Sequence, residues 1–343
     1  MTRITLSAAL VVPGFLVLGS MFLPAQEPKE PKYPHVNLAT TYAVDPKWPQ
    51  KPADLQWAAM SSIAVDSKDN VYLLTRTSAP VQVYDKSGKF LRAWGKGMET
   101  PHQLRIDGAG NIWLADAGTH VVEKYTPEGK LLMTLGTKGK AGRDQTHFNK
   151  PTDVAIGAFF DIYVSDGYGN ARVVHFDPEG KYLGEWGEPG QGPGQFSIPH
   201  SIALDSKGRV YVADRNNVRI QVFDGKGKFV EEWRDLIVPW TFSMLKGDRL
   251  WVCGSSPMQW RKEDSSLGCP PKDQVFMRFD TTGKLQQLFT LPKGLDGLER
   301  PGEVNWVHGM AFDSAGNMYL GDIIGKRAQK FVRKPRTGCD VMW

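Results

Sequence analysis

The sequence is poor in cysteine and in helical periodicity, and each shortage argues against a class of fold. Three cysteines in 343 residues are too few for a disulfide framework. If one bond forms, we expect Cys253 to pair with Cys269, because Cys269 lies in an insertion that leaves the segment holding Cys253. Beyond the N-terminal segment, no stretch repeats its apolar residues with the period of a helix over a useful length, which argues against a helical fold.

Charge of one sign is concentrated in only one place. The formal net charge is +5, and the basic residues are scattered except for one cluster near the C-terminus. This cluster consists of Lys326, Arg327, Lys330, Arg333, Lys334 and Arg336. It lacks interleaved aromatic residues and any RNA- or DNA-binding motif, so we interpret it as a solvated final strand and tail and expect no nucleic-acid partner.

The N-terminus has the pattern of a signal peptide. Arg3 precedes an apolar run from Leu6 to Leu23, and the small residue Ala25 follows. We therefore expect residues 1–25 to be removed on export, which makes residues 26–343 a secreted or periplasmic protein. The run also reaches the lower limit for a membrane span, so the alternative is an uncleaved anchor that holds the chain outside the cytoplasm.

Four copies of one unit make up much of the chain. They begin at Ile63, Leu104, Val154 and Ile202. Each copy has a short alternating run, a turn such as DSKG or DGAGN, a second run ending in a small residue and Asp, a third run, a Gly-containing turn and a fourth run. Four strands in about 40 to 50 residues are typical of one propeller blade.

Two less regular copies complete the pattern. The fifth starts at Phe242 and contains an insertion, and the sixth starts at Met310 but ends before its fourth strand. We expect the segment from Thr40 to Asp45 to supply that strand and to close the ring. The sequence therefore predicts an all-β fold, with one six-bladed β-propeller over residues 26–343.

Histidine recurs at one position of this repeat. Just before the first strand's apolar residue, the six copies carry Ser61, His102, Thr152, His200, Trp240 and His308. First strands line the central channel of a propeller, so histidines in alternate blades should converge around its axis. Three neutral imidazoles with no fourth protein ligand form the ligand set of a catalytic zinc site.

Other interpretations of the three histidines stay open. Copper and iron also accept imidazole, and three channel histidines can simply hydrogen-bond to water. The remaining histidines show no such phase and are interpreted as surface or packing residues: His35, His120, His147 and His175.

Two arginines and a tyrosine occupy related positions. Arg76 and Arg215 follow the second strands of the first and fourth copies, and Tyr168 lies one residue past the equivalent position of the third. A guanidinium binds a carboxylate through a planar fork of donors, so two of them near a metal predict an anionic substrate. The alternative is that each pairs with a local acid such as Asp66 or Asp214. Beside a metal and an arginine the pKa of a phenol falls, which would make Tyr168 a base.

Segments around these residues resemble a known family. YVSDGY, PGQFSIPHS and ADRNNVRIQ occur in one order between residues 147 and 223, and PHQLRIDGAGNIWLAD and VHGMAFDSAGNMYLGD extend the match. They are similar to the catalytic core of peptidyl-α-hydroxyglycine α-amidating lyase, a six-bladed NHL-type propeller. That family cleaves a peptidyl α-hydroxyglycine to a peptide amide and glyoxylate.

The resemblance implies a role for each candidate residue. It implies that His102, His200 and His308 hold catalytic zinc and that the base is Tyr168. It also implies that the two arginines, Arg76 and Arg215, serve the substrate's carboxylate and the developing charge. We therefore expect a metal-dependent carbon–nitrogen lyase that acts as a monomer on a peptide or small molecule with a carboxylate, with any hydroxylating monooxygenase on a separate chain.

The sequence departs from the family's pattern at three positions. The family has an Asp after its third zinc histidine that helps to hold a structural calcium, whereas Gly309 stands there in this sequence. Calcium bound in that way is not expected, although the backbone carbonyls of Ile63 and Leu104 remain candidate ligands for some ion. Trp306 replaces a family Met, which puts the substrate's identity in question. Gly169 replaces the cysteine that follows the family's catalytic tyrosine, so the family's disulfide at that cysteine is not expected here.

Two other functions are compatible with a propeller of this repeat. One is a non-catalytic NHL-type scaffold with a structural metal, which binds a protein or glycan through one face, because fold alone does not settle function. The other is a lactonase-like hydrolase, in which acidic and amide side chains hold calcium in the channel where this sequence has histidines.

Overall fold

The computed structural model describes residues 42–259, 262–263, 266–271 and 273–334. The predicted signal peptide, His35, Thr40 and Cys339 lie outside the described residues. Among the helices of the described residues, none is long and apolar enough to cross a membrane.

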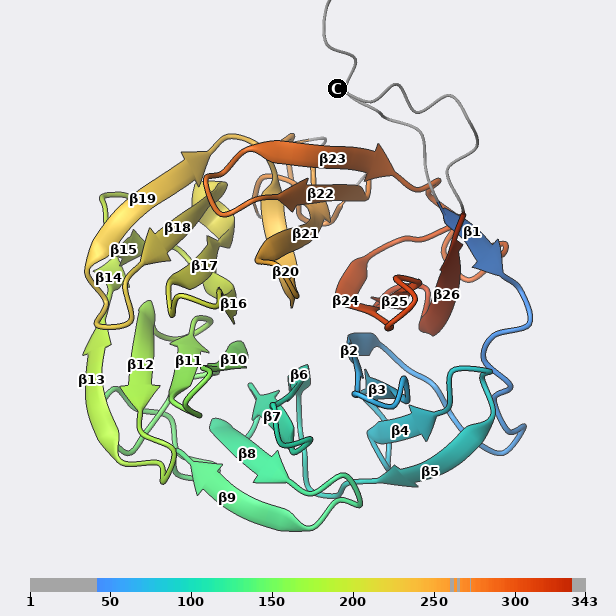
Figure 1. The fold of residues 1–343 in the computed structure, drawn as a ribbon, viewed down its shortest axis with the longest axis horizontal. Coiled ribbons are helices and arrows are strands. Elements are labelled where there is room, and N and C mark those ends of the chain that lie inside the picture. The colour runs from blue at the N-terminus through green and yellow to red at the C-terminus, as the bar shows by residue number, and fades with distance from the viewer. Residues whose placement is uncertain (1–41, 260–261, 264–265, 272, 335–343) are drawn as a thin grey trace, which may run out of the picture. The chain divides into compact units, whose positions relative to one another are not determined.

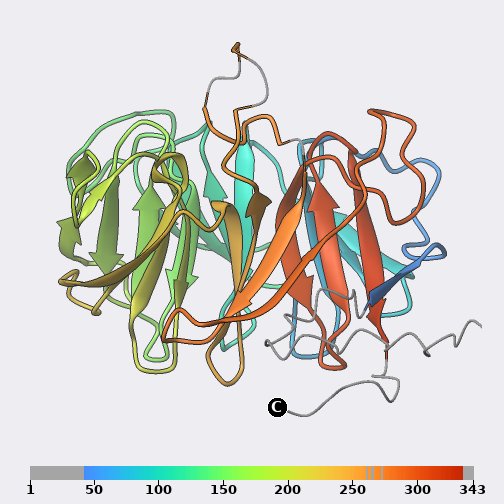
Figure 2. The same ribbon diagram turned by 90° about the horizontal axis from the view of Figure 1, so that it is seen from above.

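Six four-stranded sheets surround a central axis, and each sheet is one blade (Figure 1). The strands pair antiparallel and follow one another outward, so the first strand of each blade lies nearest the axis (Figure 1). The prediction of an all-β, six-bladed propeller is therefore confirmed. Seen from the side, the strands run between two faces of the ring (Figure 2).

The strand bounds follow the repeat. Blade 1 contains β2 (Met60–Val65), β3 (Val71–Thr75), β4 (Val81–Tyr84) and β5 (Phe90–Trp94). Blade 2 contains β6 (Pro101–Ile106), β7 (Ile112–Asp116), β8 (Val121–Tyr125) and β9 (Leu131–Leu135). Blade 3 contains β10 (Asp153–Ile156), β11 (Ile162–Asp166), β12 (Arg172–Phe176) and β13 (Tyr182–Trp186). Blade 4 contains β16 (Pro199–Leu204), β17 (Val210–Asp214), β18 (Arg219–Phe223) and β19 (Phe229–Arg234).

The last two blades and the minor elements complete the chain. Blade 5 contains β20 (Val238–Leu245), β21 (Arg249–Ser255), β22 (Val275–Phe279) and β23 (Leu285–Thr290). Blade 6 contains β24 (Val307–Phe312), β25 (Met318–Asp322), β26 (Arg327–Arg333) and β1 (Tyr42–Asp45). The minor elements are a parallel pair, β14 (Glu188–Pro189) with β15 (Gln195–Phe196), and the 3₁₀ helix η1 (Arg215–Asn217).

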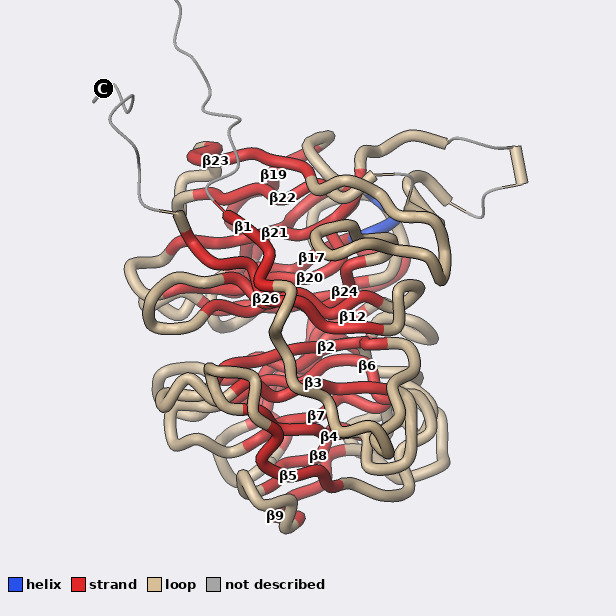
Figure 3. The backbone as a smooth tube through the Cα atoms, turned by 90° about the vertical axis from the view of Figure 1, so that its right-hand side faces the viewer, coloured by secondary structure: helices blue, strands red, loops and turns tan. Residues whose placement is uncertain are grey.

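The outermost strand of blade 6 comes from the opposite end of the described chain. β1 pairs antiparallel with β26, with Tyr42 opposite Arg333 and Asp45 opposite Lys330 (Figure 3). The segment expected to complete this blade therefore lies in its sheet, from Tyr42 onward.

A repeated aspartate turn joins the first two strands in four blades. The turn residues are Asp66, Asp107, Asp205 and Asp313. One carboxylate oxygen of each accepts backbone N–H groups two and four residues later, which fixes the turn in place of a backbone-only hairpin. These turns follow the ends of the innermost strands, so they mark the face opposite the strand beginnings.

The core lies between neighbouring blades. Trp113 and Val122 of blade 2 pack with Val154 and Val164 of blade 3, and similar clusters occur between the other blades. The second strands of five blades are buried at every position, because both of their faces are covered. Inter-blade packing thus carries the fold and leaves the beginnings of the inner strands available for a polar site.

Candidate metal centre

Three histidines meet in the central channel. His102, His200 and His308 are the second residues of β6, β16 and β24. Their ring centroids lie 4.6 to 4.9 Å apart, and all three side chains are buried. One ring nitrogen from each lies within 4.8 Å of the others, which is close enough for a single ion to bridge them.

Each imidazole is oriented by the backbone of the next blade. Three distances between Nδ1 and a carbonyl oxygen define the arrangement: 2.5 Å from His102 to Thr152, 2.6 Å from His200 to Trp240, and 2.7 Å from His308 to Ser61. A carbonyl oxygen only accepts hydrogen bonds, so each Nδ1 carries the proton and each Nε2 keeps its lone pair. The carbonyls come from the same repeat position in blades 3, 5 and 1, so the blades that lack a histidine at this position orient the histidines of their neighbours.

The protonation state of the histidines also suits a metal. Burial lowers the pKa of His102 to about 3 and the pKa values of His200 and His308 well below the usual value. The positive charges of Arg76 and Arg215 lower the pKa values of His102 and His308 further. Neutral imidazoles with unprotonated Nε2 atoms and carbonyl-bound Nδ1 atoms fit zinc and, by donor chemistry alone, also copper or iron.

Tyr168 places its hydroxyl beside two of the three histidines. The hydroxyl oxygen lies 3.0 Å from Nε2 of His102 and 3.0 Å from Nε2 of His200. The residue as a whole is 38% exposed, so the ring borders solvent while the hydroxyl points into the site. Burial raises the pKa of Tyr168, and Arg215 and Arg76 oppose this increase only in part. The lowering predicted from the sequence requires a bound metal beside the phenol and stays a prediction.

Both predicted arginines border the same site. Arg215, in η1, is buried, and its guanidinium carbon lies 5.7 Å from the centroid of the Tyr168 ring and 5.1 Å from that of Trp240. Arg76 follows β3 and is exposed, and its positive charge lowers the pKa values of Tyr168 and His102.

The alternative of local ion pairs for these arginines is not supported. Asp214 binds Arg219 at 2.7 Å, and Asp66 accepts hydrogen bonds within its own turn. Across the described ranges, neither Arg76 nor Arg215 forms an ion pair, so both positive charges remain available to an anion at the site.

An aromatic wall borders His200. Trp240 lies 5.8 Å from the His200 ring, and Trp306 lies 4.9 Å from Trp240, measured between ring centroids. Trp306, which replaces a family Met, therefore packs against a second tryptophan at this site. An apolar side chain of a ligand could pack against this pair.

An ion pair lies farther along the inner strands from the histidines, where Arg105 borders a cavity. Arg105 Nε lies 2.9 Å from one oxygen of Asp153, and Arg105 Nη2 lies 2.5 Å from the other. The same guanidinium donates to the Phe242 carbonyl at 2.9 Å and to Ser201 Oγ at 3.1 Å, so it links the inner strands of blades 2, 3, 4 and 5. In the sequence, the sign of this ion pair is a charged residue within an inner strand, which does not reveal its partner in another blade.

The structure gives a steric reason for Gly309. A Cβ atom at this position would lie 2.7 Å from the Ile63 nitrogen and 2.7 Å from Ser62 Cα, so an Asp there would require the backbone to move. Within the part of the chain that the structure describes, the only group of three or more His, Cys, Asp or Glu side chains able to hold a metal is the histidine triad. The described side chains therefore do not fit the family's calcium site.

The predicted disulfide is wrong. Cys253 is buried with its Sγ 3.6 Å from the Val307 carbonyl oxygen, and both Cys253 and Cys269 are free thiols. The three other described histidines have partners away from the triad: His120 accepts from the Lys150 N–H, His147 contacts Asp144, and His175 stacks on Tyr163.

Comparisons with known proteins agree with this fold and site. A family model for the NHL repeat matches residues 196–223. The chain is 37% identical over 209 residues to human NHL repeat-containing protein 3, a match that covers 57% of this chain and 60% of that protein. It is 39% identical over 149 residues to a probable peptidyl-α-hydroxyglycine α-amidating lyase of Caenorhabditis elegans, covering 42% of each. These matches span less than two thirds of the relatives' length.

A solved structure supports the fold alone. Virginiamycin B lyase from Staphylococcus aureus, solved with quinupristin, superimposes with a TM-score of 0.56 at 16% identity, over 86% of this chain and 88% of that chain. The fold defines the class: the chain is a six-bladed β-propeller, and residues 196–223 match an NHL repeat. Within that class, the resemblance predicted from the sequence is confirmed: the chain is similar in sequence to peptidyl-α-hydroxyglycine α-amidating lyases.

Proposed function

We propose that this protein is an exported, zinc-dependent lyase that cleaves peptidyl α-hydroxyglycines to peptide amides and glyoxylate. The observation that carries the proposal is the position of the Tyr168 hydroxyl, 3.0 Å from Nε2 of both His102 and His200. A phenol beside two metal-binding nitrogens and two uncompensated arginines suits removal of a proton from an anionic substrate. The names of the relatives support the same reaction.

His102, His200 and His308 would hold the zinc through their Nε2 atoms. When bound, zinc supplies a Lewis acid that polarises the substrate hydroxyl and lowers the pKa of nearby hydroxyl groups. Arg76 and Arg215 bind the substrate's carboxylate and stabilise the charge that develops as the bond breaks.

Tyr168 moves the proton. Its phenolic oxygen, once ionised, accepts the hydroxyl proton of the carbinolamide, the carbon–nitrogen bond breaks, and the former C–O single bond becomes the carbonyl of glyoxylate. The amide nitrogen keeps the electron pair and takes a proton from Tyr168 or from water, so the reaction consumes and releases no net proton. The aromatic wall of Trp240 and Trp306 lies where the body of the substrate can pack.

The test uses purified protein with measured metal content. Zinc-loaded protein should release one glyoxylate and one benzamide per α-hydroxyhippurate, and His200→Ala should lose both the metal and the activity. A protein that binds zinc at one ion per chain yet releases no glyoxylate would favour the scaffold with a structural metal. Less than about 0.2 metal per chain, with His200→Ala as stable as the unchanged protein, would favour a scaffold without metal.

Several finer features belong to the same proposal. We infer that β1, paired with β26, closes the ring of blades. Export by the N-terminal segment, a monomeric state and a monooxygenase on a separate chain that supplies the hydroxylated substrate complete the proposed setting. N-terminal sequencing of the protein from the native host would test cleavage after Ala25.

A further inference from the structure

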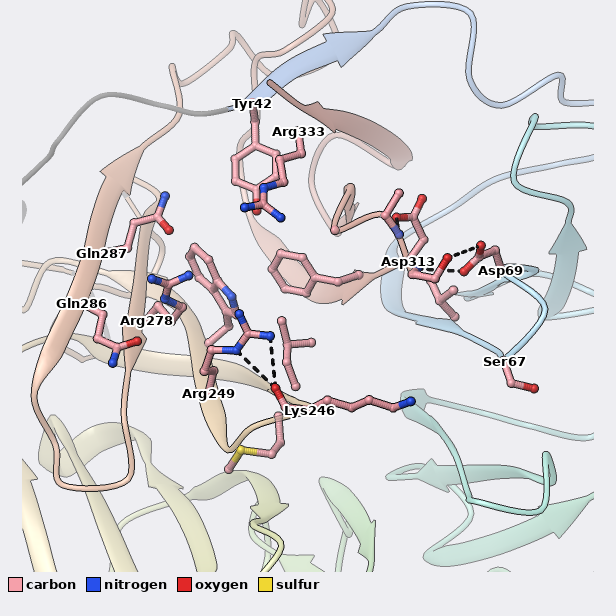
Figure 4. A pocket seen from close by; sticks show the side chains of 18 of the residues that line it. Tyr42, Ser67, Asp69, Lys246, Arg249, Arg278, Gln286, Gln287, Asp313 and Arg333 are labelled. Carbon is pink, nitrogen blue, oxygen red and sulfur yellow. Dashed lines mark hydrogen bonds between the residues drawn. The ribbon is translucent and has the colours of Figure 1, made fainter. Parts of the chain in front are cut away.

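A pocket lies at the opposite end of the inner strand β24 from His308. Figure 4 shows side chains that line this pocket. The pocket has a volume of about 670 Å³ and is bordered by the turns that follow β2, β20 and β24 and by strands β21, β22 and β26. Phe312, the last residue of β24, lines it, whereas His308 is the second residue of the same strand. Four residues of strand correspond to about 13 Å, so this pocket is separate from the metal centre.

The pocket lining is rich in positive charge. It contains five basic residues, Lys246, Arg249, Arg278, Arg333 and Lys334, and three acidic ones, Asp66, Asp69 and Asp313. The acidic groups are already used: Asp69 accepts two hydrogen bonds from Ser314, and Asp313 accepts from Asn317 and Tyr319. No ion pair of Arg249 or Arg333 occurs within the described segments.

Three of the arginines converge although they come from two different blades. Arg249 and Arg278 belong to blade 5 and Arg333 to blade 6, and all three line the same pocket. Figure 4 shows Arg333 beside Tyr42, whereas Arg249 donates from Nε and Nη2 to the Lys246 carbonyl oxygen at 3.2 and 3.1 Å. Burial raises the pKa of Tyr42, while the charges of these three arginines each lower it, as expected if all of them are close to its hydroxyl. Gathered like charges repel one another, and an anion between them would remove that repulsion.

The floor of the pocket is aromatic. Trp251 and Phe312 stack with ring centroids 5.3 Å apart and planes inclined by 29°, and the guanidinium carbon of Arg278 lies 5.7 Å from the centroid of the Trp251 ring. A planar ligand would find apolar contact there, and the volume is within the range of small-molecule sites.

We propose that this pocket binds a small aryl oxyanion, whose carboxylate or phosphate is held by Arg249 and Arg333 and whose ring packs beside Phe312. Guanidinium forks suit planar carboxylates and phosphates alike, so the oxyanion is the shared chemistry of the ligand. Part of the C-terminal basic cluster, interpreted from the sequence as a solvated tail, thus lines a binding site. This site does not depend on the proposed lyase activity.

Calorimetry on the full chain tests the proposal with phenyl phosphate, benzoate, inorganic phosphate and phenol as probes. Phenyl phosphate or benzoate should bind, whereas phenol should not. Whichever of the two anions binds with the higher affinity identifies the preferred oxyanion. The affinity should fall as sodium chloride is raised, because the contacts are ionic. Failure of both aryl anions to bind at millimolar concentration, or binding that ignores salt, would overturn the proposal.

Variants locate the binding. Arg249→Gln and Arg333→Gln should each weaken binding about tenfold, and the double variant about a hundredfold. Both side chains are exposed, so these variants should fold. If the double variant fails to fold, the two single variants still test the proposal. Arg300→Gln, a matched change at an exposed arginine outside the pocket, should bind normally, as should Arg76→Gln beside the metal centre. Loss of binding in Arg76→Gln but not in the pocket variants would show that the anion occupies the metal centre, and would refute the proposal.

Discussion

Replacing Arg105 with Met should destabilise the whole propeller, because this guanidinium joins the inner strands of four blades. The variant removes both bonds to Asp153 and the bonds to Phe242 and Ser201. It leaves the carboxylate of Asp153, whose side chain is 0% exposed, without its opposite charge. Removing one partner of a buried ion pair typically costs about 3–5 kcal/mol.

The remaining contacts of Asp153 place the expected loss near the lower end of that range. Ser201 Oγ at 2.7 Å and the backbone N–H groups of Val154 at 2.8 Å and Ile202 at 3.1 Å still donate to the carboxylate. For a domain of about 300 residues the unfolding entropy is roughly 0.6 kcal/mol per kelvin, so a loss of about 3 kcal/mol should lower Tm by about 5 °C.

Differential scanning calorimetry of five proteins tests this prediction. Besides the parent and Arg105→Met, the set includes Asp153→Leu and the double variant. The double variant should lose less free energy of unfolding than the two single variants together, because it leaves no charge unpaired. Arg300→Met, at an exposed ion pair, is the matched control and should change the free energy of unfolding by no more than about 0.5 kcal/mol. A shift below about 1 °C for Arg105→Met, or strictly additive single effects, would refute the role assigned to the ion pair.

Three further predictions concern the site and the thiols. Tyr168→Phe should keep the zinc content unchanged while kcat falls about a hundredfold or more, and a parallel loss of zinc would contradict the assignment of a proton-transfer role. Gly309→Ala places a Cβ 2.7 Å from the Ile63 nitrogen, so it should cost about 1–3 kcal/mol in chemical denaturation, and an unchanged midpoint would disprove the steric reason for this glycine. Cys253 and Cys269 are free thiols, so alkylation of the unfolded, non-reduced protein should modify both, as read from peptide mass spectra. If neither is modified, the two cysteines form the disulfide predicted from the sequence.

The repeat pattern determined the architecture because each copy carries local signals for strands and turns. Alternating apolar runs and the Asp-containing turns specify hairpins within one copy, and six copies specify six blades. The phase of the repeat also brought His102, His200 and His308 into one set, since equivalent positions of a closed ring lie at equal depth around its axis. Residue identity was sufficient for these conclusions because the interactions are local or repeat by symmetry.

Only the tertiary structure decided what surrounds those histidines. The groups that orient them are the backbone carbonyls of Thr152, Trp240 and Ser61. Every residue has a backbone carbonyl, so the residue type does not reveal which carbonyl accepts the hydrogen bond. The Arg105 ion pair and the pocket around Arg249 and Arg333 join blades that are distant in sequence, so their contacts exist only once the ring has formed. Local periodicity therefore specified the propeller, whereas closure of the ring placed the charges and carbonyls that give its two ends different chemistry.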